Sequence, residues 1–320
     1  MAAGLGTRLR PLTYEVSKPL VPIANRPVME HILLLLRRHG FGPVIANLHW
    51  FGDTIRDRFG DGSGLGVDLT YRHEDKLLGT AGGVRNVSEF FGDEPFLVMA
   101  ADALTDIDLA ALRAAHEAND GIATLAVTRV FDVSDFGVVI TDSAGRIQGF
   151  QEKPDRAEAL SDLASCMIYV LDREIFDYFP AKPVVDFARD VFPALLSNDV
   201  PFHVHQVDAY WNDVGSLPEY LRGNLDAVQG AVEVEPAGEL LDPWGGDEAL
   251  ERGDPGVCGR VLAGEGCEIG AGVRLDGPLV IGAGCTIGAG ARVKESVVLA
   301  EAAVPPGALV ASAIYGSQAA

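Results

Sequence analysis

The C-terminal fifth of the chain repeats every six residues, and this period constrains the fold more than any other feature of the sequence. An aliphatic residue recurs at this spacing, and a small or apolar residue follows each one four positions later. The aliphatic series is Ile269, Leu275, Ile281, Ile287, Val293 and Leu299, and the second series is Val273, Leu279, Cys285, Ala291, Val297 and Ala303. A fixed hexapeptide period predicts one short strand and one turn per repeat, stacked as a solenoid.

Glycines separate the repeats, as in Ile269-Gly-Ala-Gly and Ile281-Gly-Ala-Gly. The pattern resembles the left-handed parallel β-helix, in which residues 257–310 would make about three triangular coils. A Gly/Ala-rich linker is the alternative interpretation, but a linker would not keep its aliphatic residues in register. We therefore expect a hexapeptide-repeat β-helix at 257–312, followed by a tail at 313–320.

Residues 1–230 follow a different pattern, in which strand-like apolar runs alternate with amphipathic stretches. The candidate strands are Val44–Asn47, Val67–Tyr71, Phe96–Ala100, Ile122–Thr128, Val138–Thr141 and Met167–Leu171. The candidate helices are Val28–His39 and Leu109–Ala118, the second capped by Asp108. This alternation predicts an α/β domain with a Rossmann-like, mostly parallel sheet covered by helices on both faces. Residues 231–256 are rich in proline, glycine and acidic residues, so we expect a linker there.

The charge balance excludes several classes of partner. The chain has 25 Lys and Arg against 46 Asp and Glu, a formal charge of −21, which repels nucleic acid and anionic membranes. No apolar run reaches the roughly 18 residues that span a bilayer, and no signal peptide is expected. Four cysteines without CxxC spacing indicate a reducing compartment, so we expect a cytoplasmic protein.

Positive charge is nevertheless concentrated beside the first glycines of the chain. Residues 1–40 hold six basic and two acidic residues, around the stretches Gly4-Leu-Gly-Thr-Arg-Leu and Ser17-Lys-Pro-Leu-Val-Pro22. Gly4 and Gly6 let the backbone approach a phosphate chain, while Thr7, Arg8 and Lys18 add donors and charge. The stretch matches neither a P-loop nor the GxGxxG pattern. It therefore predicts an anion-binding loop of another kind.

Seven short motifs in a fixed order make the chain resemble the sugar-1-phosphate nucleotidyltransferases, the NDP-sugar pyrophosphorylases, and the mannose-1-phosphate guanylyltransferase-like members in particular. They are Gly4-Leu-Gly-Thr-Arg-Leu, Lys18-Pro-Leu-Val-Pro, Leu78-Gly-Thr-Ala-Gly82, Asp102 with Leu104-Thr-Asp106, Phe136-Gly-Val138, Glu152-Lys-Pro154 and Tyr210-Trp-Asn-Asp-Val-Gly215, followed by the β-helix. The resemblance implies a Mg²⁺-dependent enzyme that joins an NTP and a sugar 1-phosphate into an NDP-sugar and pyrophosphate. GTP with mannose 1-phosphate, giving GDP-mannose, is the first choice. Another pair, such as dTTP, UTP, ATP or CTP with glucose 1-phosphate or a related sugar, stays open.

The resemblance also implies a role for each motif residue. Arg8, Lys18 and Asp102 would be catalytic, and Asp102 and Asp213 would hold the Mg²⁺. Nucleotide binding falls to Gly4, Gly6, Thr7, Gly79, Thr80 and Gly82, and sugar-phosphate binding to Gly137, Glu152 and Lys153. The sequence supports one placement independently: Asp102 follows the strand Phe96–Ala100, and open α/β sheets bind ligands at the carboxyl ends of their strands.

Three departures from the family pattern affect the expected site. Only Met1 to Ala3 precede Gly4, where the family carries a full apolar strand, and a start upstream of Met1 would complete it. Ala101 stands where the family has glycine before the aspartate. The family's Asn-Ala-Gly-Ile-Tyr reads Ser165-Cys-Met-Ile-Tyr169, which leaves the sugar undetermined.

Two functions of other classes compete with the enzyme. A non-catalytic regulatory paralogue that senses nucleotide sugars could lose Arg8, Lys18, Asp102 or Asp213, yet all four are present. A purely structural β-helix scaffold leaves the charged glycine loop unexplained. We expect the β-helix to pack on the catalytic domain or on another subunit, giving a homo-oligomer.

Overall fold

The computed structural model describes residues 1–241, 243 and 255–316. Its contacts divide the chain into two compact units. The first unit comprises Met1–Gly4, Leu33–Ala101 and Ile107–Trp211, and the second comprises Leu5–Ile32, Asp102–Asp106 and the chain from Asn212 onward. The two units interleave along the sequence, and each is described by itself.

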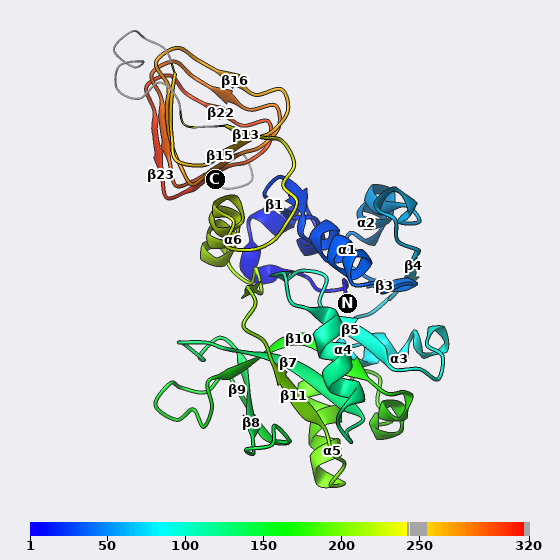
Figure 1. Ribbon diagram of the computed structural model, residues 1–320. Helices are drawn as coiled ribbons and strands as arrows, with labels where there is room; N and C mark the ends of the chain where they lie inside the picture. The colour runs from blue at the N-terminus through cyan, green and yellow to red at the C-terminus, as the bar shows by residue number, and fades with distance from the viewer. Residues whose placement is uncertain (242, 244–254, 317–320) are drawn as a thin grey trace. The chain divides into compact units, whose positions relative to one another are not determined.

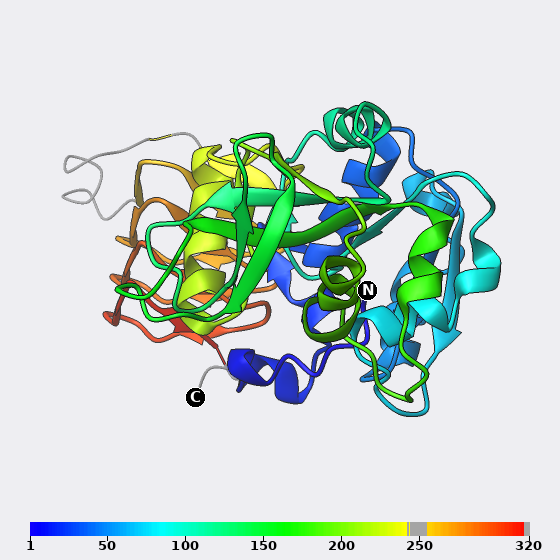
Figure 2. The same cartoon turned by 90° about the horizontal axis from the view of Figure 1, so that it is seen from below.

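A six-stranded sheet forms the centre of the first unit. Its strands follow the order β11 (His203–Gln206), β7 (Ala123–Arg129), β10 (Leu163–Leu171), β8 (Gly137–Thr141) and β9 (Ile147–Glu152), with β5 (Phe96–Met99) also on β10. Figures 1 and 2 show these strands side by side. A separate parallel pair consists of β3 (Val44–Leu48) and β4 (Leu69–His73).

The expected α/β class is confirmed, with parallel pairing in β3–β4, in β7–β11 and in the C-terminal coils. Within the six-stranded sheet, however, β10 runs antiparallel to β5, β7 and β8, and β8 runs antiparallel to β9. The reason lies in the connections. No helix separates β7, β8, β9 and β10 along the chain, and a parallel neighbour needs a long crossover, usually helical.

Two helices correspond to the ranges that the sequence predicts: α1 (Val28–Arg38), which begins in the second unit, and α4 (Leu109–Glu117). The first unit also contains α2 (Gly52–Phe59), α3 (Thr80–Arg85) and α5 (Phe192–Ser197), the last preceded by a π-helical turn at Phe187–Val191. The Asp108 side chain accepts a hydrogen bond from the Ala111 amide, as expected for the cap of α4. Tyr169, Phe187 and Phe192 pack ring against ring in the core.

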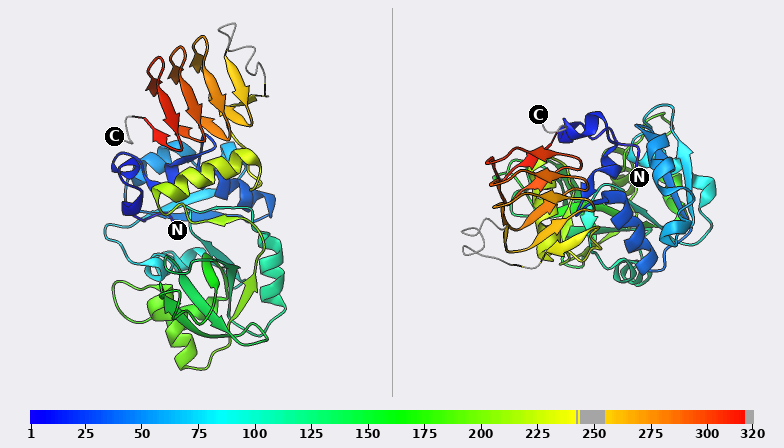
Figure 3. Two further views of the ribbon diagram at one scale, coloured as in Figure 1. Left: turned by 90° about the vertical axis from the view of Figure 1, so that its left-hand side faces the viewer. Right: turned by 90° about the horizontal axis from the view of Figure 1, so that it is seen from above.

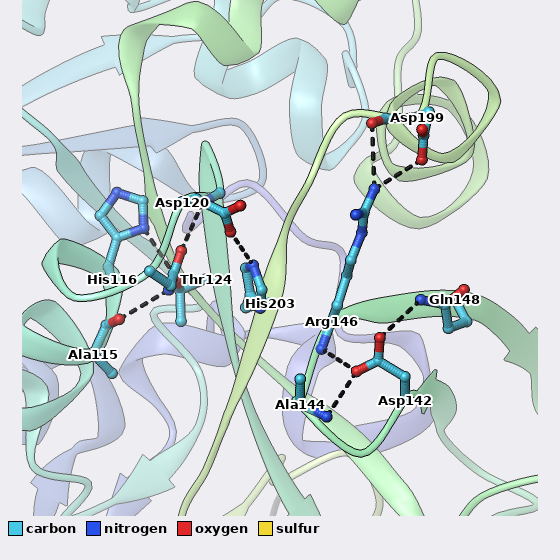
Figure 4. A network of polar contacts seen from close by, with 12 residues as sticks. Ala115, His116, Asp120, Thr124, Asp142, Ala144, Arg146, Gln148, Asp199 and His203 are labelled. Atoms are coloured by element: carbon cyan, nitrogen blue, oxygen red, sulfur yellow. Dashed lines mark hydrogen bonds and ion pairs between the residues drawn. The ribbon is translucent and has the colours of Figure 1, made fainter.

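Polar contacts anchor β11 to the loops around it (Figure 4). His203 Nε2 lies 2.9 Å from Asp120 Oδ1, just before β7. On the other side, Arg146 Nη2 lies 2.8 Å from Asp199 Oδ1 and joins the β8–β9 turn to the segment before β11. These contacts fix the edge of the sheet.

The second unit begins with three short 3₁₀ turns, at Thr7–Leu9, Leu12–Tyr14 and Lys18–Leu20. A two-residue hairpin, β1 (Pro22–Ile23) and β2 (Arg26–Pro27), follows, and β6 (Leu104–Thr105) pairs with β12 (Trp211–Asn212). The helix α6 (Leu217–Gln229) is capped by Ser216 and ends at Gly230, whose φ of 80° suits glycine.

The C-terminal coils form a parallel β-helix with three faces (Figures 1 and 3). One face holds β14 (Gly256–Cys258), β17 (Arg274–Asp276), β20 (Arg292–Lys294) and β23 (Leu309–Ala311). The second holds β15 (Val261–Ala263), β18 (Leu279–Ile281), β21 (Val297–Val298) and β24 (Ile314–Tyr315), and the third holds β16 (Glu268–Ile269), β19 (Thr286–Ile287) and β22 (Ala303–Val304). Apart from β13 (Glu239–Leu241), neighbours on every face are parallel.

The six-residue register is correct through Val293 and wrong beyond it. Leu275 pairs with Val293, 18 residues on, but Ile281 pairs with Val298 instead of Leu299. The interior residues that follow are Val298 and Ala302, not Leu299 and Ala303. The turn explains the shift: two residues separate Asp276 from Leu279, whereas Glu295 alone, with a φ of 45°, separates Lys294 from Ser296.

Within the second unit, the β-helix rests on α6, which lies along the base of the stacked coils in Figure 3. Arg260 donates to the Val228 carbonyl at 3.1 Å, and the Asn25 amide donates to the Ile281 carbonyl at 3.0 Å. Part of the expected linker joins the coils, because β13 (Glu239–Leu241) pairs antiparallel with β15. Residues 242 and 244–254 of that linker, and the end of the expected tail, 317–320, lie outside the described residues. None of the described helices is long and apolar enough to cross a membrane.

Candidate active site

Four of the predicted residues come together in the second unit. The Lys18 ammonium lies 2.8 Å from Asp102 Oδ2 and donates to the Asp213 carbonyl oxygen, also at 2.8 Å. Arg8 Nη2 lies 3.5 Å from Asp213 Oδ2. Lys18 is 12% exposed, while the Arg8 side chain is 56% exposed. Two cations and two carboxylates from three distant chain segments therefore meet here, with the Lys18 ammonium partly buried among them.

The conformation of the glycine loop requires a glycine at position 6. Gly6 has a φ of 61°, and a Cβ there would lie 3.0 Å from the Lys18 Cβ, so a side chain would be both strained and crowded. The Thr13 hydroxyl donates to the Gly6 carbonyl at 2.7 Å. Thr7 starts the first 3₁₀ turn and is exposed, and Gly4, in the first unit, has no neighbour that a Cβ would meet within 4 Å.

A tight loop presents Asp213. The Asn212 side chain, itself buried, accepts from the Val214 amide at 2.7 Å, and Asp213 Oδ1 accepts from the Gly215 amide at 3.0 Å. A Cβ at Gly215 would lie 2.3 Å from Asp213 Oδ2. Glycine at this position is therefore what allows the carboxylate to fold back over the loop.

The donor set fits a hard divalent cation. Asp102 and Asp213 are 27% and 24% exposed, so both can exchange a contact with a cationic side chain for one with a metal. Among the described residues there is no group of three or more His, Cys, Asp or Glu that could hold an ion. Mg²⁺ matches such a pair, because it usually takes one or two carboxylates and completes its shell with water and phosphate oxygens.

The loop Gly79–Gly82, in the first unit, is bound largely to the protein itself. Gly79 has a φ of 81°, and a Cβ on it would lie 2.4 Å from the Val185 carbonyl oxygen. That oxygen accepts from the amides of Ala81 and Gly82 at 3.0 and 2.9 Å. The Thr80 hydroxyl donates to Asp186 Oδ2 at 2.8 Å. The small residues of this loop therefore allow it to pack closely against Val185 of the same chain.

A buried polar pair beside this loop was missed by sequence reasoning. The Glu74 carboxylate, 2% exposed, accepts from Asn47 Nδ2 at 2.6 Å and from the Leu78 amide at 3.2 Å. Asn47 Oδ1 accepts from the Ala2 amide at 3.0 Å. A Cβ at Gly83 would lie 2.5 Å from Asn47 Nδ2. The available signal is weak: Asn47 lies near the end of the apolar strand β3, and Glu74 directly follows β4.

The predicted sugar-phosphate residues also lie together, in the first unit. Gly137 at the start of β8 pairs with Glu152 at the end of β9, and a Cβ on Gly137 would lie 3.3 Å from Glu152 Oε2. Lys153 has a φ of 49°, and its amide donates to the Phe136 carbonyl at 3.0 Å. Glu152 and Lys153 are both exposed.

Comparisons with known proteins show what the chain is similar to. The Nucleotidyl transferase family model matches residues 1–230, and the GMPPB C-terminal domain model matches residues 257–320. The chain is 37% identical to a UTP–glucose-1-phosphate uridylyltransferase of Synechocystis, over 99% of this chain and 86% of that protein. It is 35% identical to a mannose-1-phosphate guanylyltransferase of Mycobacterium tuberculosis, over 88% and 78%. A crystal structure of a putative glucose-1-phosphate thymidylyltransferase from Bacillus anthracis matches with a TM-score of 0.62 at 25% identity, over 70% of this chain and 91% of that chain.

Proposed function

Because the chain belongs to the nucleotidyl transferase family, we propose that it transfers a nucleotidyl group from an NTP to a sugar 1-phosphate, and that GTP and mannose 1-phosphate are its substrates. The relative from Mycobacterium tuberculosis and the matching C-terminal family model support this pair. UTP with glucose 1-phosphate is the second candidate, because the relative from Synechocystis carries that name and is more identical to this chain.

The observation that carries the proposal is the position of Lys18. Its ammonium contacts the Asp102 carboxylate and the Asp213 carbonyl at once, with Arg8 beside Asp213. The two cations can neutralise phosphate groups, and the two carboxylates can bind a metal ion, so the cluster suits a reaction between two phosphorylated substrates. The Lys18 and Arg8 cations would neutralise the triphosphate as it reacts.

The reaction requires no proton transfer to start. A phosphate oxygen of the sugar 1-phosphate, already anionic, forms a bond to the α-phosphorus, and the bond from that phosphorus to the oxygen bridging the α and β positions breaks. Pyrophosphate leaves with that oxygen. Catalysis then consists of alignment and of charge stabilisation on the leaving group. When bound by Asp102 and Asp213, Mg²⁺ would supply Lewis-acid stabilisation of the phosphate oxygens.

The other predicted residues take binding roles in this proposal. The backbone around Gly4, Gly6 and Thr7 donates to the phosphates, and the loop of Gly79, Thr80 and Gly82 contacts the nucleobase. Gly137 allows close approach of the sugar, Glu152 accepts from sugar hydroxyls, and Lys153 binds the phosphate of the sugar. We place all of these roles within residues 1–230 and assign the coils from residue 257 to support and assembly.

The test is a grid of nucleoside triphosphates against sugar 1-phosphates, with pyrophosphate release as the readout. GTP with mannose 1-phosphate is expected to give the highest kcat/KM, and omission of Mg²⁺ is expected to abolish turnover. A maximum at UTP with glucose 1-phosphate would select the second candidate. No turnover with any pair, together with measurable binding of an NDP-sugar, would instead make the protein a sensor.

We also propose that the β-helix mediates a homo-oligomer. Leu309 on the last described strand of one face, β23, is 73% exposed, and that strand has no further partner among the described residues. An apolar residue on an open strand edge favours pairing with another chain. Light scattering should give a mass above that of one chain, and Leu309→Asp should lower it. A wild-type monomer at micromolar concentration would contradict this proposal.

A further inference from the structure

Met167 adopts a backbone conformation that its side chain disfavours. Its φ is 59°, in the left-handed region that glycine occupies readily and a residue with a Cβ does not. It lies in an irregularity of β10: Ser165 pairs with Val127 and Tyr169 pairs with Leu125, so β10 advances by four residues where β7 advances by two. Strained backbone of this kind persists where the surroundings enforce it, and it often marks a functional site.

The surroundings of this bulge hold it from several directions. The Met167 carbonyl accepts from the Ala100 amide at 3.2 Å, and the Trp211 indole donates to the Cys166 carbonyl at 3.2 Å. The Tyr169 hydroxyl, in the core, donates to Met167 Sδ at 3.1 Å. Both the backbone and the thioether of Met167 are therefore fixed, which makes an alternative position of its side chain costly.

The strand register locates the bulge beside the proposed sugar-phosphate residues. Gly137 pairs with Glu152, and Val138 pairs with Ala164, so one residue further along this antiparallel pair Gly137 stands opposite Ser165. Glu152, Gly137 and Ser165 thus form a row across three strands, on one face of the sheet.

Met167 packs against residues that adjoin this row. Its side chain contacts the core cluster to which Tyr169 and Val127 belong, and Val127 is the partner of Ser165. The Met167 side chain is partly exposed, so part of it is available to a ligand. The thioether offers no strong donor or acceptor, and its sulfur is already engaged by Tyr169.

We propose that Met167 determines which sugar 1-phosphate this site accepts, an inference that rests on the proposed function. Its side chain forms an apolar wall next to Gly137 and Glu152. The site accepts a sugar that directs a hydrogen atom toward this wall. A sugar that directs a hydroxyl or hydroxymethyl group there is disfavoured, because the group has too little space and loses a hydrogen bond to water. Excluding a group by shape in this way discriminates by roughly tenfold to a hundredfold.

The experiment measures kcat/KM for glucose 1-phosphate and for three analogues that each differ at one carbon: mannose, galactose and xylose 1-phosphates. Met167→Ala removes the wall but keeps the backbone constraint, and Met167→Gly removes both. In each variant, we expect the poorest analogue to gain at least about tenfold in kcat/KM relative to the best one. Met167→Leu, which keeps the bulk, should retain the wild-type order.

Glu301→Gly is the matched control, because Glu301 is exposed in the β-helix with a φ of 61° and carries the same backbone constraint. It should leave the four values in their wild-type ratio. Ratios within twofold of wild type in both Met167→Ala and Met167→Gly would overturn the inference, as would a change in Met167→Gly alone, which would assign the effect to the backbone. If Met167→Gly fails to fold, the Met167→Ala result decides. A wild-type enzyme that turns over none of the sugar phosphates would refute the proposed function instead.

Discussion

Substitutions of Asp102 and Asp213 test whether these two carboxylates bind the Mg²⁺. Asp102→Asn and Asp213→Asn each remove a negative charge at nearly constant volume, so we expect kcat to fall by about 100-fold or more while the fold is retained. The measurement is turnover across a Mg²⁺ titration, with thermal unfolding as a check.

Asp276→Asn is a suitable control for these variants. Asp276 is 25% exposed and paired with Arg274 in the β-helix, so it loses the same charge from a similar environment. Its turnover should match that of wild type. Wild-type rates in both site variants would refute the metal assignment.

Substitution of Arg8 tests whether this side chain stabilises the charge on the departing pyrophosphate. Arg8→Ala should lower kcat by about 100-fold and change the KM for the NTP much less, because charge on the leaving group grows toward the transition state. Arg113→Ala, which removes an arginine of similar exposure from the surface of α4, is the control. A rise in KM at unchanged kcat would make Arg8 a ground-state binding residue.

His31 gives the protein a pH-dependent stability. Burial lowers the pKa of His31 below its ordinary 6.5, against the opposing effects of the Ile23 carbonyl and Glu30. In the unfolded chain the imidazole takes up a proton near pH 6.5, whereas in the folded chain it does so only at lower pH. The unfolded state therefore binds more protons in this window, and the free energy of unfolding should decrease as the pH falls below 6.5.

Urea unfolding at pH 7.5 and pH 5.5 measures this effect. His31→Gln keeps a donor for the Ile23 carbonyl, which His31 Nε2 contacts at 2.9 Å, and removes the titration. The loss of stability between the two pH values should be smaller in the variant than in wild type. Equal losses in the two proteins would contradict the prediction.

At the level of elements, the start of α3 depends on a glycine. Gly79→Ala would place a Cβ 2.4 Å from the Val185 carbonyl oxygen at a φ of 81°, so we expect a loss of about 2 kcal/mol or more in the free energy of unfolding. Gly92→Ala is the control, because a Cβ there meets nothing within 4 Å and its φ is unremarkable. Urea unfolding of both variants measures the difference. A loss of equal size in the two variants would show that the contact with Val185 is unimportant.

Hydrophobic periodicity predicts the positions of many strands but not their direction. Periodicity locates β3, β4, β5, β7 and β8 within about two residues. It places the start of β10 four residues too late, and the predicted strands include neither β9 nor β11. It does not give their direction, because direction depends on the length and path of each connection. It likewise misses the shift at Glu295, because a turn can lose one residue without changing the composition of the coil.

For the whole molecule, the contacts of α6 predict the effect of removing the β-helix. Deletion of residues 257–320 would expose the α6 surface under β18 and remove the partners of Asn25 and Val228. We expect a lower melting temperature and an altered assembly state, measured by calorimetry and light scattering. Arg292→Ala, on an exposed position of the coils, should change neither melting temperature nor mass. A truncated chain with the melting temperature of the intact protein would contradict this prediction.

The sequence by itself determines the α/β class and the β-helix, and it predicts the chemistry of the site. A six-residue period admits few structures other than stacked coils, and glycines among Thr7, Arg8 and Lys18 predict anion binding, because both patterns are local. The tertiary structure alone decides what those residues touch. Arg8, Lys18, Asp102 and Asp213 are separated by up to 205 residues, and only the fold brings Lys18 between the two aspartates. It also decides that Thr80 bonds Asp186, that Glu74 is buried, and that Met167 is held in a strained bulge, because each depends on chain segments that meet only after folding.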